Sequence, residues 1–269
     1  MQVPAPLEGR RIMVTRAEEQ AGNFVALLHQ RGATTVECPT IQLVPPVKWD
    51  EIDAAAGILG SFDWLILTSV NGVRFFFDRL RTLGIPPTEQ NYKVCAVGPK
   101  TEEALIALGI RPDLVPRQFT GEGVVAAFEE VGVQGKKVLF PKADGARDLI
   151  PQELARRGAI VTAPVVYRNV LPPQMPDDAY RALEKQALDV IVFSSPSTVR
   201  NLAILLGGEE LLRERLGGVV VASIGPITSR ACRELGLQVL VEPEQATLDA
   251  LLDELERFFV NKPDRHSVS

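Results

Sequence analysis

Short apolar runs alternate with longer amphipathic stretches along most of the chain. The apolar runs are rich in Val and Ile and occupy residues 12–15, 64–68, 93–97, 138–140, 190–194 and 219–224. The stretches that follow them have helical spacing and occupy residues 18–31, 71–83, 100–108, 147–157, 198–206 and 228–235. Strands that are apolar on both faces and alternate with helices are typical of a parallel sheet covered on both sides. The pattern therefore predicts an α/β fold that is doubly wound.

Glycine and proline mark where these elements stop. The glycines that fall at predicted helix ends, as C-cap glycines do, are Gly32, Gly84, Gly109, Gly158 and Gly236. Two extended, β-rich segments, 38–46 and 164–173, each end in a Pro-Pro pair, which stops a helix. Each segment either adds a strand to its own domain or pairs with the other as a ribbon between domains, and the pattern leaves both open.

The whole pattern is written twice, with a period of about 126 residues. Residues 9–17 match 135–143, residues 31–33 match 157–159, residues 62–69 match 188–195, and residues 97–101 match 224–228 with an offset of 127. Four matches in nearly one register indicate a duplicated domain, and 269 residues suffice for two domains with their own cores. Two similar domains predict a cleft between them, where ligands commonly bind.

Composition and charge narrow the class of protein. A hydrophobic content of 46% with 23% charged residues is typical of a globular domain in water. The net charge of −5 argues against broad nucleic-acid binding, which needs a concentrated basic surface. No apolar run approaches the roughly 20 residues that cross a bilayer, and the first eight residues lack a signal-peptide pattern. We therefore expect a cytoplasmic protein without membrane contact.

Cysteine and histidine contribute little candidate chemistry. Cys38, Cys95 and Cys232 form no CxxC pair, so we interpret them as small buried hydrophobic residues. The two histidines, His29 and His266, are not repeated between the copies. A histidine-based triad or a zinc site is therefore not expected.

Candidate binding residues gather where the predicted strands end. In a doubly wound sheet, ligands bind beyond the carboxyl ends of the strands, beside helix N-termini that attract anions. The small hydroxylic residues, glycines, amides and cations at these places are Thr15, Arg16, Thr68, Ser69, Asn71, Gly98, Lys100, Thr101, Lys142, Ser194, Ser195, Ser197, Gly225 and Thr228. Helix capping explains any single one of them. Six such places on two domains predict an anion-binding cleft.

A dinucleotide fingerprint is not part of this picture. The one candidate, Gly121-Glu122-Gly123, lacks the later glycine of that motif and follows no clear strand.

Several motifs, taken in their order and spacing, resemble the uroporphyrinogen-III synthase family. They are residues 62–73 (FDWLILTSVNGV), 97–99 (VGP), 139–141 (LFP), 166–168 (VYR), 193–197 (FSSPS) and 223–228 (SIGPIT). The resemblance covers residues from about 9 to 255. It implies cyclising dehydration of hydroxymethylbilane to uroporphyrinogen III with inversion of the last pyrrole ring. It also implies that no cofactor or metal takes part.

The resemblance implies an interlaced architecture. Two similar flavodoxin-like domains would comprise residues 9–37 with 174–260, and residues 46–163. A two-stranded β ribbon of residues 38–45 and 164–173 would join them, with flexible tails at 1–8 and 261–269. We expect a monomer that binds a linear tetrapyrrole with eight carboxylates and makes at most transient contact with the enzyme that produces it.

Tyr167 is the only tyrosine in either extended segment, and its repeat counterpart is Ile41. It either packs at the hinge with its hydroxyl in water or donates a proton to the departing hydroxyl of the substrate as a general acid. Two other classes of protein fit two similar α/β lobes. One is a small-anion binding or sensory module without catalysis, and the other is a phosphosugar isomerase or transferase.

Overall fold

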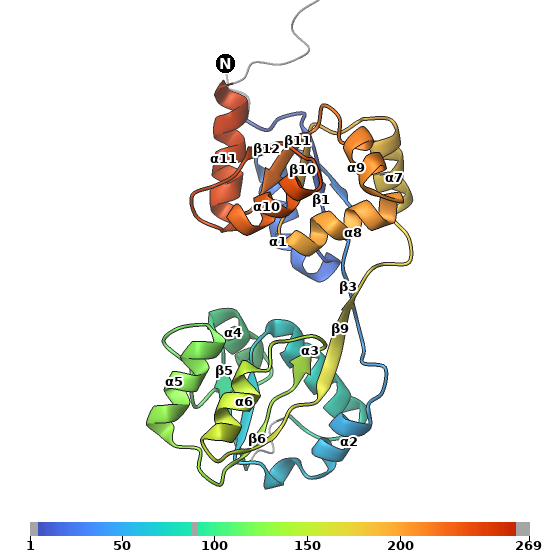
Figure 1. Cartoon of the computed structure of the whole chain (residues 1–269). Helices are drawn as coiled ribbons and strands as arrows, with labels where there is room; N and C mark the ends of the chain where they lie inside the picture. The colour runs from blue at the N-terminus through green and yellow to red at the C-terminus, as the bar shows by residue number, and fades with distance from the viewer. Residues whose placement is uncertain (1–4, 88–90, 262–269) are drawn as a thin grey trace, which may run out of the picture. The chain divides into compact units, whose positions relative to one another are not determined.

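The computed structural model describes residues 5–87 and 91–261, drawn in colour in Figure 1. The chain divides into two compact units. Unit 1 comprises the described residues up to Gln42 together with those from Val170 onward, and unit 2 runs from Leu43 to Asn169. The chain therefore passes twice from one unit to the other, so that unit 1 is assembled from two separate parts of the sequence.

Unit 1 contains a five-stranded parallel sheet with the order β12-β11-β10-β1-β2. Its strands are β1 (Arg11–Val14), β2 (Thr34–Glu37), β10 (Val190–Phe193), β11 (Val220–Ser223) and β12 (Val239–Val241). Counted along the chain, this order is 2-1-3-4-5, as in flavodoxin-like folds. The register pairs Met13 with Ile191. Strand β1, from the first part of the unit, thus lies against β10 from the second part.

Helices cover both faces of this sheet (Figure 1). One face carries α1 (Glu18–Gln30) and α11 (Leu248–Asn261); the other carries α7 (Asp177–Glu184), α8 (Pro196–Leu206), α9 (Glu209–Arg215) and α10 (Pro226–Glu234). Successive strand residues point to opposite faces. Ile12 therefore joins the core under α1 and α11, whereas Met13 joins the core under α7 to α10.

Both ends of the described chain reach into the tails predicted at 1–8 and 261–269. Leu7 is fully buried and packs in the same core as Ile12 and Phe24, because a turn over residues 6–9 directs its apolar side chain inward. Asn261 is the last residue of α11. Leu7 thus contributes to the core of unit 1 and α11 extends to residue 261, while the flexibility of the two tails stays a prediction. Residues 1–4 and 262–269, with His266, lie outside the described residues.

Unit 2 contains a four-stranded parallel sheet with the order β5-β4-β6-β8. Its strands are β4 (Trp64–Leu67), β5 (Lys93–Ala96), β6 (Lys137–Leu139) and β8 (Ile160–Thr162). A parallel bridge from Cys95 to Leu114 extends the sheet beyond β5. The core on one face includes α2 (Asp50–Gly57), η1 (Leu59–Ser61), α3 (Val70–Thr82) and α4 (Pro99–Ala107), and the core on the other includes α5 (Gly121–Val131) and α6 (Leu149–Arg156).

These sheets confirm the α/β fold with parallel strands and two domains. The six strands and six helices that the apolar pattern predicted are all present, with ends within two residues of those expected, and all five predicted C-cap glycines have positive φ. When strands at matching positions of the predicted repeat are treated as equivalent, the sheets of the two units have the same strand order. The period of about 126 residues stays a prediction.

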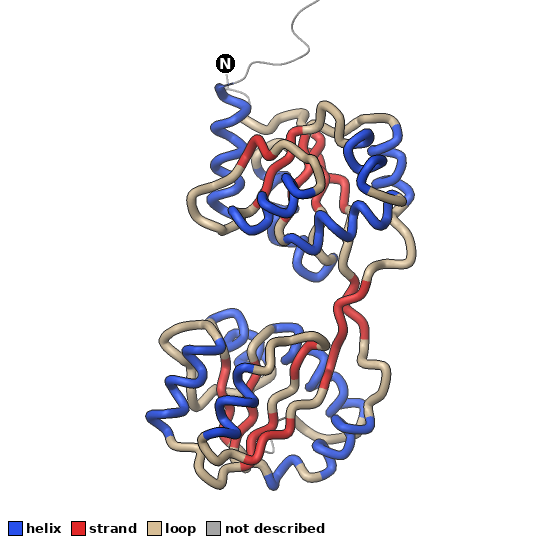
Figure 2. The backbone as a smooth tube through the Cα atoms, in the orientation of Figure 1, coloured by secondary structure: helices blue, strands red, loops and turns tan. Residues whose placement is uncertain are grey.

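The two extended segments pair with each other, as Figure 2 shows where the red strands run side by side. Strands β3 (Gln42–Val44) and β9 (Val165–Val170) are neighbours in one sheet. The prediction of a two-stranded ribbon lacks one strand, however, because β7 (Lys142–Ala143) adds a third strand parallel to β9. The chain after β6 stays extended, and the amide of Lys142 donates to the carbonyl of Pro164 at 2.9 Å.

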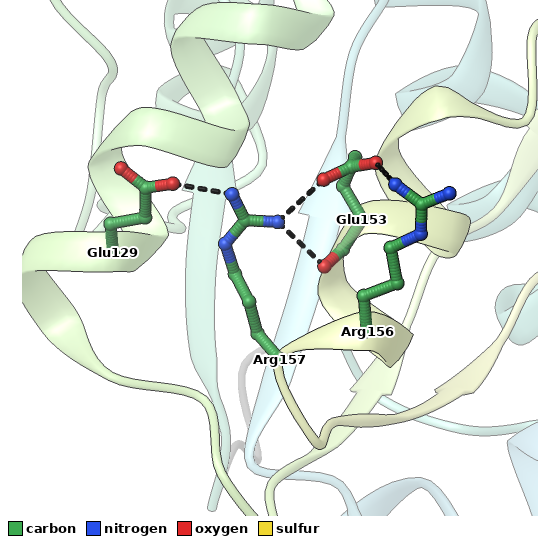
Figure 3. A network of polar contacts seen from close by, with 4 residues as sticks. All are labelled: Glu129, Glu153, Arg156 and Arg157. Carbon is green, nitrogen blue, oxygen red and sulfur yellow. Dashed lines mark hydrogen bonds and ion pairs between the residues drawn. The ribbon is translucent and has the colours of Figure 1, made fainter.

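Ion pairs tie the two helices on one face of unit 2 together (Figure 3). Arg157, directly after α6, contacts Glu129 of α5 and also donates to Glu153 of α6 at 2.7 Å. Arg156 donates to the same Glu153 at 2.8 Å. The four side chains form a network, because one carboxylate is shared by two arginines and one guanidinium by two carboxylates. Such a network holds α5 and α6 together more firmly than isolated surface pairs do.

Within residues 5–87 and 91–261, none of the helices has both the length and the apolar composition required to cross a membrane.

Candidate functional site

The carboxyl edge of the unit 2 sheet brings several predicted residues together. Strands β4, β5 and β6 are parallel and in register, so their last residues end at one edge. Thr68 and Ser69 follow β4, Gly98 follows β5, and Lys142 follows β6. Strand β7 also pairs Ala143 with Tyr167, which carries the tyrosine to the same edge.

Tyr167 and Ser69 touch at this edge. The phenol oxygen of Tyr167 lies 3.4 Å from Ser69 Oγ, and its ring stacks on Phe75 of α3 with centroids 5.4 Å apart and planes 15° apart. Tyr167 is only 8% exposed. Packing therefore fixes the ring, while the hydroxyl faces a second hydroxyl at the start of a helix. The ring is packed as the first interpretation expects, but the hydroxyl contacts Ser69, where that interpretation placed it in water. The role of Tyr167 as a general acid stays a prediction.

Ser69 is held in place by the helix that it caps. Its backbone is extended, and its Oγ accepts from the amide of Gly72 at 3.0 Å, as in an N-cap. A serine oxygen that accepts one bond still has its own hydrogen to donate. The N-terminus of the 13-residue helix α3 also carries a partial positive charge. The arrangement can stabilise negative charge that develops on the phenol oxygen.

The other candidates in unit 2 are in different environments. Thr68 and Asn71 are half-buried, Lys100 is exposed, and Thr101 is buried at 3% exposure. Lys142 is already engaged, because its ammonium lies 2.5 Å from a carboxylate oxygen of Asp148. Its charge is compensated within the protein, so it is a weaker candidate for an anion than the sequence suggested.

Gly98 precedes α4 and requires glycine for a backbone reason. Its φ of +91° lies in the region that side chains rarely adopt, and an added Cβ would also lie 3.5 Å from Phe119. Because Phe119 lies at an ordinary contact distance, a larger residue here would be strained by its backbone conformation and not by its neighbours.

The carboxyl edge of the unit 1 sheet also gathers predicted residues. Ser195 caps α8 in a capping box with Thr198, and its Oγ lies 2.9 Å from Ser197 Oγ. Ser194 is half-buried and Ser197 is exposed. Thr15 is fully buried, and its hydroxyl donates to the carbonyl of Val192 at 2.7 Å. Thr15 therefore links β1 to β10 and is not open to a ligand.

Arg16 is the most distinctive cation at this edge. Its guanidinium donates to Gln20 at 3.3 Å, but its Nε is buried and lacks a hydrogen-bond partner, which holds for no other buried side-chain nitrogen or oxygen described in the chain. Burial also lowers the pKa of Arg16. A buried donor without an acceptor is costly. An anion that accepts from this nitrogen would remove that cost.

Gly225 and Thr228 begin α10, and both are buried. Three residues beside this turn that the sequence analysis did not single out as site candidates are Ser223, Ser229 and Glu242. Ser223 Oγ lies 2.5 Å from Ser229 Oγ, and Ser229 donates to Glu242. Their separation along the chain follows neither a helical nor a strand period, so no local signal indicated the contact.

The remaining candidate chemistry is structural. All three cysteines are buried, and burial raises the pKa of each thiol to about 12, which disfavours a thiolate nucleophile. His29 Nε2 pairs with Thr35 Oγ1 at 2.8 Å. Among the described residues, His, Cys, Asp and Glu side chains form no group of three or more that could hold a metal.

Both units are α/β domains with hydroxyls and helix N-termini at the carboxyl edges of their sheets, and unit 1 adds an arginine with an unpartnered nitrogen. These features are typical of a protein that binds a small molecule, either an enzyme or a binding module. Comparison with known proteins decides between these. The model of the family "Uroporphyrinogen-III synthase HemD" matches residues 22–253. The chain therefore belongs to the uroporphyrinogen-III synthase family, and it is a lyase of porphyrin biosynthesis.

Individual relatives agree with this assignment. The chain is 39% identical to a uroporphyrinogen-III synthase of Synechococcus elongatus over 256 residues, covering 94% of this chain and 97% of the relative. It is 32% identical to one from Chlorobaculum parvum, covering 87% of this chain and 93% of the relative. A crystal structure of a mutant uroporphyrinogen III synthase from Thermus thermophilus superposes with a TM-score of 0.56 at 23% identity, covering 94% of this chain and all of the other, and shows a shared fold.

Proposed function

We propose that Tyr167 and the residues at the two carboxyl edges convert hydroxymethylbilane to uroporphyrinogen III. The observation that carries this proposal is the contact between the Tyr167 phenol and Ser69 Oγ at the start of α3. This contact supports a proton-donating role for Tyr167, because it orients the phenol at the sheet edge where α/β proteins bind ligands.

The reaction makes two demands on the protein. Loss of the hydroxyl from the substrate needs a proton donor and leaves a cationic azafulvene, and the last pyrrole then attacks through a spiro intermediate before the ring closes. The same substrate cyclises without enzyme to the symmetric type I isomer, so the protein must also hold one conformation. Each 1.4 kcal/mol or so of preference changes the product ratio about tenfold. Orientation by a few contacts can supply that preference.

Tyr167 meets the first demand. Phenols keep their proton at neutral pH and can donate it. As the proton moves toward the leaving hydroxyl, negative charge develops on the phenol oxygen. Ser69 can then donate its free hydrogen to that oxygen, and the positive end of α3 stabilises the charge further. The stacked Phe75 keeps the ring from turning away.

Arginine and backbone amides meet the second demand. Arg16 offers a buried Nε without a partner, and a substrate carboxylate is the acceptor that suits it. The starts of α3, α4, α8 and α10 present amides that bind carboxylates. We assign Thr68, Ser69, Asn71, Gly98, Lys100 and Thr101 in unit 2, and Arg16, Ser194, Ser195, Ser197, Gly225 and Thr228 in unit 1, to carboxylate binding. Thr15 and Lys142 support the edges on which these residues lie.

The decisive experiment is turnover of freshly generated hydroxymethylbilane by the purified chain, with the product isomers separated by chromatography. The type III isomer should dominate with and without a chelator. A binding module without catalysis would hold the tetrapyrrole and leave the isomer ratio at that of the reaction without protein. Loss of turnover with the chelator would contradict the cofactor-independent mechanism.

We further propose that the chain works as a monomer in the cytoplasm and meets the enzyme that makes hydroxymethylbilane only transiently. Light scattering in solution should therefore give a mass near 29.4 kDa. A stable dimer at micromolar concentration would contradict the monomer.

A further inference from the structure

Three hydrogen-bonded side chains lie beside the turn before α10 in unit 1. Ser223 ends β11, Ser229 lies in the second turn of α10, and Glu242 directly follows β12. Both serines are fully buried, whereas the Glu242 side chain is 30% exposed. Parallel pairing of β11 with β12 brings the three together at the carboxyl edge of the sheet.

The direction of the hydrogen bonds in this chain can be assigned. Glu242 Oε2 can only accept, so the single hydroxyl hydrogen of Ser229 goes to it. Ser229 Oγ must then accept from Ser223 Oγ, 2.5 Å away. Ser223 Oγ also lies 3.2 Å from the carbonyl of Gly225 and shares its hydrogen with that oxygen. The Glu242 carboxylate therefore orients Ser229, Ser229 orients Ser223, and Ser223 holds the carbonyl of Gly225.

The equivalent turn in unit 2 lacks this chain and has a different backbone. With the offset of 127, Ala96 replaces Ser223 and Glu102 replaces Ser229. The glycine of that turn, Gly98, has a φ of +91°, whereas Gly225 is fully extended with a φ of 167°. The first helical bond is the same in both, since the carbonyls of Gly98 and Gly225 accept from the residue four positions on at 3.1 and 3.0 Å. The hydrogen-bonded side chains are therefore present in the unit whose turn is extended and absent in the other, although the helix begins with the same bond in both.

We propose that Ser223, Ser229 and Glu242 are positioning residues that hold the Gly225 turn in the extended conformation that receives a substrate carboxylate. The inference rests on the proposed role of Gly225 and the start of α10 in binding the substrate. The three residues act through the turn, because both serines are fully buried and cannot themselves touch the substrate. The effect of disturbing them should therefore fall on substrate binding more than on the chemical step.

The test is a set of variants assayed for KM and kcat with hydroxymethylbilane, each with its melting temperature. S223A removes the contact with the Gly225 carbonyl, and E242A removes the terminal acceptor. Both should raise KM about tenfold with kcat changed less than threefold. E242Q keeps an acceptor oxygen for Ser229 and should restore KM to within about twofold of the wild type. R233A removes the exposed partner of Glu242, 3.5 Å away, and should leave KM unchanged.

A double variant separates positioning from general destabilisation. Since Glu242 acts through Ser223, S223A/E242A should raise KM no further than S223A alone, whereas independent effects multiply. Wild-type KM in S223A, or a defect in E242Q as large as in E242A, would overturn the inference. S223A removes a single oxygen and decides the matter if E242A does not fold. If the wild-type chain itself yields no type III isomer, the proposed function fails and not only the positioning role.

Discussion

Replacing Tyr167 with phenylalanine tests the proposed proton donor with the smallest available change. The substitution removes one oxygen and keeps the ring that stacks on Phe75. Stability should therefore fall by at most the value of one neutral hydrogen bond, about 0.5–1.5 kcal/mol. The contact with Ser69 is long, at 3.4 Å, so the loss should lie at the lower end of that range.

The expected loss of activity is larger than the loss of stability. General acids contribute about 10²–10⁴-fold to a rate. Hydroxymethylbilane already loses its hydroxyl without enzyme, so the effect here should fall at or below the low end. A reduction of kcat by about 10- to 100-fold corresponds to roughly 1.4–2.7 kcal/mol in the barrier. This decrease should exceed that of any single Ser→Ala change at the two carboxyl edges, including S69A, which also removes a helix cap.

The assay measures kcat, KM and the type III fraction for Y167F, with circular dichroism and a melting curve to show that the variant folds. Tyr180→Phe on α7 is the matched control, because it makes the same chemical change at a side chain that is 50% exposed in unit 1. The control should keep wild-type kinetics. Equal kcat in Y167F and the wild type would refute the proton-donor role and leave Tyr167 as a packing residue.

Three further perturbations test the site and the fold. Arg16→Gln should raise the KM for hydroxymethylbilane more than it lowers the melting temperature, because it removes a cation with an unpartnered buried nitrogen; an unchanged KM would contradict its role. Gly98→Val should lower stability and raise KM, whereas Gly9→Val, at a similar positive φ with no neighbour within 4 Å, should lower stability alone. The backbone N–H of Lys137 lowers the pKa of the Asp63 carboxyl, so Asp63→Asn should lower the melting temperature at pH 7. Because the pKa of Asp63 in the folded state lies below its ordinary value of 3.8, the ionised carboxyl stabilises the fold above pH 3.8, and this stabilisation is lost in acid. The melting temperatures of Asp63→Asn and the wild type should therefore converge as the pH falls below about 4.

Most of the fold could be predicted because its signals are local. Apolar strands and amphipathic helices can be recognised from a few consecutive residues. A glycine such as Gly236, with a φ of +79°, marks a helix end by its conformation alone. The glycines of Gly121-Glu122-Gly123 also have a local structural role, at the start of a helix. Thr120 caps α5 by accepting from the amide of Gly123, and a Cβ at Gly123 would lie 2.1 Å from the carbonyl of Gln118.

The features that could not be predicted depend on contacts between distant residues. Leu7 is buried because of what packs on it, and nothing in its neighbourhood of prolines and polar residues indicates this. Strand β7 exists only because β9 lies beside it. Likewise, the sequence shows Arg16 and Lys142 as equivalent cations, and only the structure shows that Lys142 already has Asp148 as its partner.

The most direct test of the central claim is the isomer ratio that the purified chain produces. Freshly generated hydroxymethylbilane is divided between a sample with the chain and one without it, and the type I and type III products are separated and quantified. We expect mostly type III with the chain and type I without it. Type I alone in both samples, from a chain that is folded by circular dichroism, would contradict it.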